Sequence, residues 1–117
     1  MGARRLLRSF GHALAGLGHV LRSEANARIH VAIAALVVGG GLLFGLGAGE
    51  WRWLILAIGL VWAGEAFNTA FEYLCDALSP QPSEAVKRAK DIAAGATLVL
   101  AVTAGLIGAS IFWPYLF

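Results

Sequence analysis

The stretch from Trp53 to Leu74, WLILAIGLVWAGEAFNTAFEYL, decides the fold, because it is long and apolar and carries acidic residues only in its second half. A helix of about 22 residues, rising ~1.5 Å at each, crosses a hydrocarbon core about 30 Å thick. Two further apolar stretches of similar length flank it, at 29–46 and 92–112. The sequence therefore predicts an all-α membrane protein with transmembrane helices at 29–46, 53–74 and 92–112, within one domain of residues 1–117.

The composition indicates that lipid is the main solvent of this chain. Hydrophobic residues make up 59% of it, charged residues only 14%, and the mean hydropathy is +0.75. A soluble domain carries about 25% charged residues to cover its surface, so much of this surface must face lipid. A Gly-rich turn at 45–50 and a loop with two prolines at 79–83 separate the three spans, since these prolines do not fit a continuous helix.

Residues 3–23 have the pattern of an amphipathic helix, with leucines on one face and basic side chains on the other. Such a helix suits the headgroup region, apolar face down. No unbroken apolar segment or Ala-x-Ala site follows the basic start, which argues against a signal peptide. Because the basic residues alternate with leucines, we expect no nucleic-acid partner. The basic face carries Arg4, Arg5, Arg8, His12, His19 and Arg22.

The basic residues also predict the orientation of the spans. They gather before the first and third spans, and a single one, Arg52, lies at the other end. By the positive-inside rule, the N-terminus and the loop 79–83 face the cytoplasm. The aromatic residues Trp51, Trp53, Trp113 and Tyr115 then lie at the outer interface. The cytoplasmic basic residues are Arg4, Arg5, Arg8, Arg22, Arg28, Lys87, Arg88 and Lys90.

The second span carries a stripe of polar side chains, Glu65, Asn68, Glu72 and Asp76. Their spacings of 3, 4 and 4 residues place all four within about 80° of one helix face. A carboxylate inside the apolar region costs at least ~2.5 kcal/mol, so a task or a partner is expected. Carboxylate and amide oxygens are ligands that suit Mg²⁺. The stripe predicts a magnesium site in the inner half of the membrane.

Further charged residues lie at the same predicted depth as Glu72. Glu24 comes at the cytoplasmic end of the first span, and Lys90 and Asp91 at the start of the third. At this level a water-soluble nucleotide can meet a lipid headgroup. The alternative, structural interpretation is that these charges hold the helices together as ion pairs, Glu72 with Lys90 or Asp76 with Arg88.

We consider three functions that these residues could serve. A lipid kinase uses the whole constellation. A small proton-coupled exporter of cationic drugs needs a membrane acid such as Glu65, but has no use for Glu24, Lys90 and Asp91 at one level. A membrane assembly factor built on Gly and Ala packing leaves the acidic stripe unexplained. His30 is expected to lie at the membrane interface without a catalytic role.

The pattern Glu65-x-x-Asn68-x-x-x-Glu72-x-x-x-Asp76, followed after a loop by Ala-Lys-Asp at 89–91, resembles the signature of the prokaryotic diacylglycerol kinase family. The segment 24–30, Glu-Ala-Asn-Ala-Arg-Ile-His, is similar to the undecaprenol kinase branch of that family. The resemblance covers about residues 10–110. It implies a homotrimer with active sites shared between subunits, in the inner membrane of a bacterium.

The resemblance also implies an activity and site residues. The reaction is transfer of the ATP γ-phosphate, with Mg²⁺, to a membrane lipid alcohol, undecaprenol first and diacylglycerol second. By position, Glu65 is the general base and Asn68 orients the reacting groups, while Glu24 and Glu72 bind Mg²⁺ beside the nucleotide. The other implied residues are Lys90, Asp91 and His12 at the nucleotide, with Asp76 and Arg28 in support.

This sequence departs from the family pattern at three places. Ala27 and His12 stand where aromatic residues are expected, and Gln81-Pro82-Ser83 replaces a segment that often carries an acidic residue and a histidine near the nucleotide. The acidic core of the pattern is complete.

Overall fold

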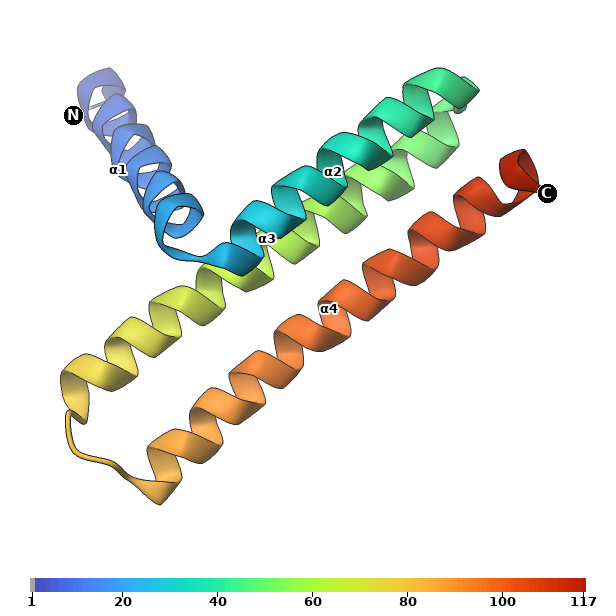
Figure 1. The fold of residues 1–117 in the computed structure, drawn as a ribbon. Coiled ribbons are helices and arrows are strands. Elements are labelled where there is room, and N and C mark those ends of the chain that lie inside the picture. The colour runs from blue at the N-terminus through green and yellow to red at the C-terminus, as the bar shows by residue number, and fades with distance from the viewer. Residues whose placement is uncertain (1) are drawn as a thin grey trace.

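The computed structural model describes residues 2–117 as four helices joined by short connections (Figure 1). They are α1 (Gly2–Ser23), α2 (Ala25–Phe44), α3 (Ala48–Leu78) and α4 (Glu84–Leu116). Helices α2, α3 and α4 are each long and apolar enough to cross a membrane. The predicted all-α fold with three apolar spans is confirmed. Consecutive long helices run in opposite directions, and α1 leaves the bundle at an angle (Figure 1).

The turn between α2 and α3 depends on two glycines. Gly45 ends α2 with φ +69°, in the left-handed region that favours glycine. The first apolar helix therefore stops at Phe44, two residues before its predicted end at Leu46. Gly41 lies beneath the indole of Trp51, and a Cβ on it would lie 2.7 Å from Trp51 Cη2. A larger residue at position 41 would push this ring away.

The densest packing lies at the turn end of the bundle. Leu46, Leu54 and Ile111 form a small buried cluster, against which Trp51 and Phe112 pack. The Tyr115 hydroxyl donates a 2.7 Å hydrogen bond to Glu50 Oε1, and the same oxygen accepts from the Gly47 N–H at 3.0 Å. These contacts fasten the last turn of α4 to the first turn of α3.

Helices α3 and α4 extend well beyond their predicted apolar stretches, 53–74 and 92–112. Ser83 is the N-cap of α4, and its hydroxyl accepts a 3.5 Å hydrogen bond from the Val86 N–H. The polar turns around Glu84 and Lys87 are therefore continuous with the apolar helix. Opposite them, α3 carries Asp76 to its last turn, so both helices project a charged end beyond the apolar region.

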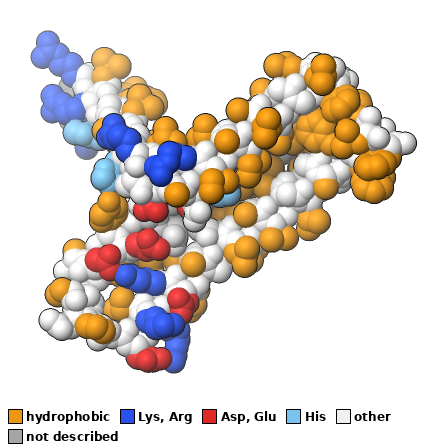
Figure 2. Space-filling view, viewed as in Figure 1, with side chains coloured by type: hydrophobic (Ala, Val, Ile, Leu, Met, Phe, Trp, Pro, Cys, Tyr) orange, Lys and Arg blue, Asp and Glu red, His pale blue; other side chains and the backbone are white. Residues whose placement is uncertain are grey.

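Charged and apolar side chains separate along the molecule. Figure 2 shows blue and pale blue side chains over α1, red and blue side chains toward the loop end of α3 and α4, and mainly orange side chains over the other end. Leucines along α1 are widely exposed, including Leu7 at 70% and Leu14 at 67%. Helix α1 touches the bundle near its end, where Val20 is buried and a 2.7 Å hydrogen bond joins His19 Nε2 to the Tyr73 hydroxyl.

Candidate functional site

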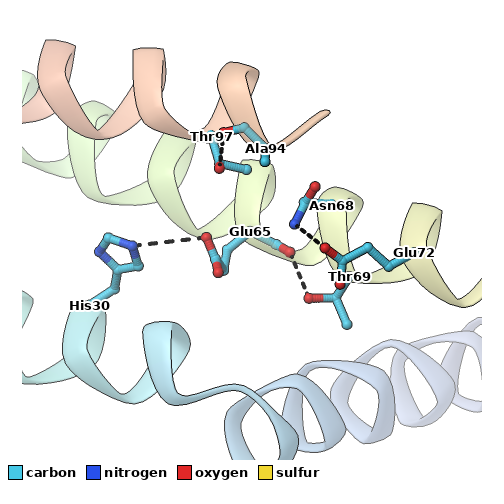
Figure 3. A network of polar contacts seen from close by, with 7 residues as sticks. All are labelled: His30, Glu65, Asn68, Thr69, Glu72, Ala94 and Thr97. Atoms are coloured by element: carbon cyan, nitrogen blue, oxygen red, sulfur yellow. Dashed lines mark hydrogen bonds and ion pairs between the residues drawn. The ribbon is translucent and has the colours of Figure 1, made fainter. Parts of the chain in front are cut away.

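The predicted polar stripe on α3 runs from a buried to an exposed end. Glu65 is buried, with 7% of its surface exposed, Asn68 and Glu72 are half-buried, and Asp76 is exposed. Each lies about one helical turn from the next, so one face of α3 connects the interior of the bundle with the charged end. The Asn68 Nδ2 donates a 3.4 Å hydrogen bond to Glu72 Oε1 (Figure 3).

Glu65 faces α2, where His30 is its neighbour. His30 Nε2 lies 3.9 Å from Glu65 Oε2 (Figure 3). The Thr69 hydroxyl donates to the backbone carbonyl of Glu65 at 3.0 Å and leaves the carboxylate to other partners. Sequence reasoning missed His30, because this contact depends on how α2 packs against α3. The signal was an imidazole in one span near the depth of a carboxylate in the next.

The oxygen atoms of the stripe fit a hard cation. Asn68 Oδ1 is buried and has no hydrogen-bond partner in the structure. It lies on the same face of α3 as the carboxylates of Glu65 and Glu72, and such oxygen donors suit Mg²⁺. Within residues 2–117, however, no three Asp, Glu, His or Cys side chains converge into a metal cluster.

The charged end of α3 and α4 is held by ion pairs. Lys90 Nζ donates to Asp76 across the two helices, and Lys87 Nζ donates to Asp91 Oδ2 at 2.8 Å along α4. These carboxylates raise the pKa of Lys90 and of Lys87, both of which precede the apolar stretch 92–112. Both lysines therefore stay cationic at neutral pH, as binding of a phosphate requires.

The ion pairs predicted by the structural interpretation, Glu72–Lys90 and Asp76–Arg88, are wrong in their partners. Asp76 pairs with Lys90, and Arg88 instead lies 4.0 Å from Glu84, one turn back on α4. The i, i+4 spacing lets Arg88 pair with Glu84 on the same helix, α4, whereas Lys90 reaches across to Asp76 on α3. A groove of about 640 Å³ runs between this end and the loop, lined by residues that include Asp76, Ser83, Lys87, Lys90 and Asp91.

The three remaining predicted site residues lie on α1 or at its junction with α2. Glu24 is the N-cap of α2, and its half-buried side chain makes no capping hydrogen bond. Arg28 Nη1 donates to the carbonyls of Leu21 at 3.2 Å and Arg22 at 2.8 Å, so it caps the C-terminal end of α1. His12 is exposed on α1. Arg28 thus supports the corner that carries Glu24.

Two apolar grooves adjoin the stripe. The first, of about 600 Å³, lies among α2, α3 and α4 and extends from His30 past Val61 and Ala104 to Leu116. The second, of about 560 Å³, lies between α3 and α4 and is lined by Asn68, Phe67 and Phe71 among others. The first groove thus begins at His30, the neighbour of Glu65, and the second includes Asn68. Both continue over mainly apolar side chains.

Fold and site together define a small multi-pass membrane protein with an acidic site near the charged end of its bundle. Comparison with known proteins gives the family. The family described as "Prokaryotic diacylglycerol kinase" matches residues 11–112. The "Undecaprenol kinase" of Bacillus subtilis (strain 168) is 39% identical over 112 residues, which are 96% of this chain and 91% of that protein.

Two further relatives carry the name "Diacylglycerol kinase". The one from Synechocystis sp. is 36% identical over 113 residues, 96% of this chain and 65% of that protein. The one from Sinorhizobium sp. is 33% identical over 110 residues, 92% of this chain and 78% of that protein. The chain belongs to the prokaryotic diacylglycerol kinase family and is a lipid kinase that uses ATP as co-substrate. These findings give no support to the exporter.

Proposed function

We propose that this kinase phosphorylates undecaprenol in preference to diacylglycerol. The likeness to the Bacillus subtilis enzyme supports this choice, as does the segment 24–30, which is similar to that branch of the family. One observation carries the proposed site: Glu65 is a carboxylate buried in a membrane-crossing helix, on the face that continues to Glu72 and the charged end. This face links the lipid phase to the water where ATP is found.

Glu65 is the general base of the proposed reaction. Its carboxylate accepts the proton of the lipid hydroxyl as the hydroxyl oxygen bonds to the γ-phosphorus, and the bond to the β,γ-bridging oxygen breaks to release ADP. Asn68, one turn away, orients the reacting groups. Phosphoryl transfer depends chiefly on positioning and charge neutralisation, and a placed general base contributes about 10²- to 10⁴-fold.

Glu24 and Glu72 are the proposed ligands of Mg²⁺, which supplies neutralisation of the charge on the ATP phosphates. Both carboxylates are half-buried, and the side chain of Glu24 makes no capping hydrogen bond. The cations Lys90 and Lys87 line the groove at the charged end, where Asp91 and the loop 79–83 complete a site for the nucleotide. His12, on the exposed face of α1, is proposed as a further nucleotide contact.

We propose a homotrimer in which neighbouring subunits complete each site. Within the described residues 2–117, Glu24 and Glu72 do not belong to a three-residue metal cluster, so a second copy is the natural source of the missing ligand. The long helices leave most of their apolar side chains exposed, which suits contact with lipid and with other copies. The distribution of basic residues supports a location of the N-terminus and α1 at the cytoplasmic face of the inner membrane.

The test is a turnover assay with purified protein in detergent or lipid. Wild-type protein with Mg²⁺-ATP releases ADP on addition of undecaprenol, and competition with diacylglycerol measures the preference. We expect undecaprenol to have the higher kcat/KM. A higher value for diacylglycerol would reverse the preference, and no lipid-dependent turnover with either alcohol would refute the proposed function.

A further inference from the structure

His30 is the polar side chain that faces the carboxylate of Glu65. The two side chains come from different helices, and Figure 3 shows the imidazole of α2 directed at the carboxylate of α3. Their Nε2 and Oε2 atoms are 3.9 Å apart, with 23% and 9% of the respective side chains exposed. In the part of the chain that the structure describes, residues 2–117, no lysine or arginine side chain forms an ion pair with Glu65.

The other polar groups near Glu65 are engaged elsewhere. Thr69 donates to the backbone carbonyl of Glu65, and the amide of Asn68 donates to Glu72. The orientation of the Glu65 carboxylate therefore depends on the imidazole. Buried charges in proteins are normally paired, because an unpaired charge in an apolar setting is costly. The distance of 3.9 Å exceeds that of a direct hydrogen bond, and a small rotation of either side chain would bring the imidazole N–H to the carboxylate.

The position of the pair gives it a consequence for the reaction. His30 lies at one end of the apolar groove among α2, α3 and α4, whose other lining residues are mainly apolar, such as Ile33 and Val61. Glu65 is not among the lining residues, but its contact with His30 sets its carboxylate beside this end of the groove.

We propose that His30 is a positioning residue of the kinase reaction, which holds the Glu65 carboxylate at the groove end so that it meets the acceptor hydroxyl. This rests on the proposed role of Glu65 as base. The proton passes from the hydroxyl to Glu65 as the oxygen–phosphorus bond forms and ADP leaves, and the imidazole fixes the carboxylate without exchanging a proton. Misplacement of a reacting group by about 1 Å costs up to 10²-fold.

The test compares two substitutions of His30 in the full-length protein. His30→Gln keeps a side-chain N–H near the place of Nε2, whereas His30→Phe keeps ring volume and removes every polar atom. We expect His30→Phe to lower kcat about 10- to 100-fold and His30→Gln to retain most of it, with KM for Mg²⁺-ATP unchanged in both. Equal loss in both variants, or wild-type kcat in His30→Phe, would overturn the proposal.

His19→Phe is the matched control, because His19 also reaches across to α3 but contacts Tyr73, not Glu65. It should keep the wild-type kcat; a loss as large as that of His30→Phe would show that any lost contact between helices has this effect. Thermal unfolding of each variant separates misfolding from misplacement.

A double-mutant cycle tests the coupling directly. In the Glu65→Asp background, the shorter side chain already withdraws the carboxylate from His30. There, His30→Phe should lower kcat by a smaller factor than it does in wild type. Strictly additive losses would refute positioning through Glu65. Wild-type protein that shows no lipid-dependent turnover would instead refute the proposed function, and the inference with it.

Discussion

The two ends of the helical bundle differ in what holds them together. At the turn end, a buried cluster around Leu54, the close approach of Trp51 to Gly41 and the Tyr115–Glu50 hydrogen bond join α2, α3 and α4. At the charged end, the ion pair Lys90–Asp76 joins α3 to α4, and the pairs Lys87–Asp91 and Arg88–Glu84 lie within α4. Exposed ion pairs contribute only about 0–1 kcal/mol each, so we expect the first end to supply most of the stability and the second to carry the proposed nucleotide site.

The separation has a physical reason. Binding of a nucleotide and a cation needs charged groups close to water, and such groups do not build a stable core. The turn end has no such demand and can bury its apolar side chains. Substitutions at the charged end should therefore remove activity with little effect on unfolding, and substitutions at the turn end should do the reverse.

The largest effect is expected for Glu65→Gln. The amide is nearly the same size as the carboxylate but does not accept the hydroxyl proton, so turnover should fall by at least about 10²- to 10⁴-fold. ADP release with saturating lipid alcohol measures it, and size-exclusion chromatography in detergent should show the same oligomer as wild type. A rate near wild type would show that Glu65 is not the base.

Glu72→Ala should act next most strongly, through the use of Mg²⁺-ATP. Loss of one ligand typically weakens metal affinity by 10–100-fold or more, as loss of supporting partners does. The Mg²⁺ concentration for half-maximal turnover should therefore rise at least about tenfold. Glu50→Ala, which removes a carboxylate at the turn end, is the control and should leave this value unchanged. If both variants respond alike, Glu72 does not hold the metal.

Most of the fold could be predicted from the sequence, because apolar length and helix breakers report directly on spans and turns. The three long helices were expected from three apolar stretches, and the Pro loop and the Gly-rich turn fall between them. The helices extend beyond most ends of the predicted apolar stretches, since polar turns such as those after Ser83 continue α4 for reasons of capping rather than hydropathy. Apolar length measures the hydrocarbon region and not the helix.

The candidate site was predictable only along single helices. The spacing of Glu65, Asn68 and Glu72 places them on one face of α3 whatever surrounds that helix. The partner of each side chain depends on packing between helices, which one sequence does not report. Hence His30 was assigned no role although it faces Glu65, and Asp76 was paired with Arg88 although Lys90 points to it.

Gly41→Ala tests the turn end and should affect stability alone. The added Cβ would lie 2.7 Å from the indole of Trp51, and overpacking of this kind costs about 1–3 kcal/mol. Gly39→Ala is the matched control on the same helix, because nothing lies within 4 Å of its Cβ position; it should gain roughly 0.5–1 kcal/mol from lower chain entropy. Unfolding in detergent measures both, and equal shifts would contradict the described packing.

The smallest effects are expected from two Tyr→Phe substitutions, Tyr115→Phe at the turn end and Tyr73→Phe at the contact with α1. Tyr115→Phe removes the hydroxyl that donates to Glu50 and should lower the free energy of unfolding by about 1 kcal/mol, with kcat unchanged. Tyr73→Phe removes the hydrogen bond to His19 on α1, which lies outside the three-helix bundle. It should leave global unfolding unchanged and increase amide hydrogen exchange in α1. If Tyr73→Phe proved the more destabilising of the two, α1 would belong to the stable core, and the division of the molecule into a structural and a chemical end would be wrong.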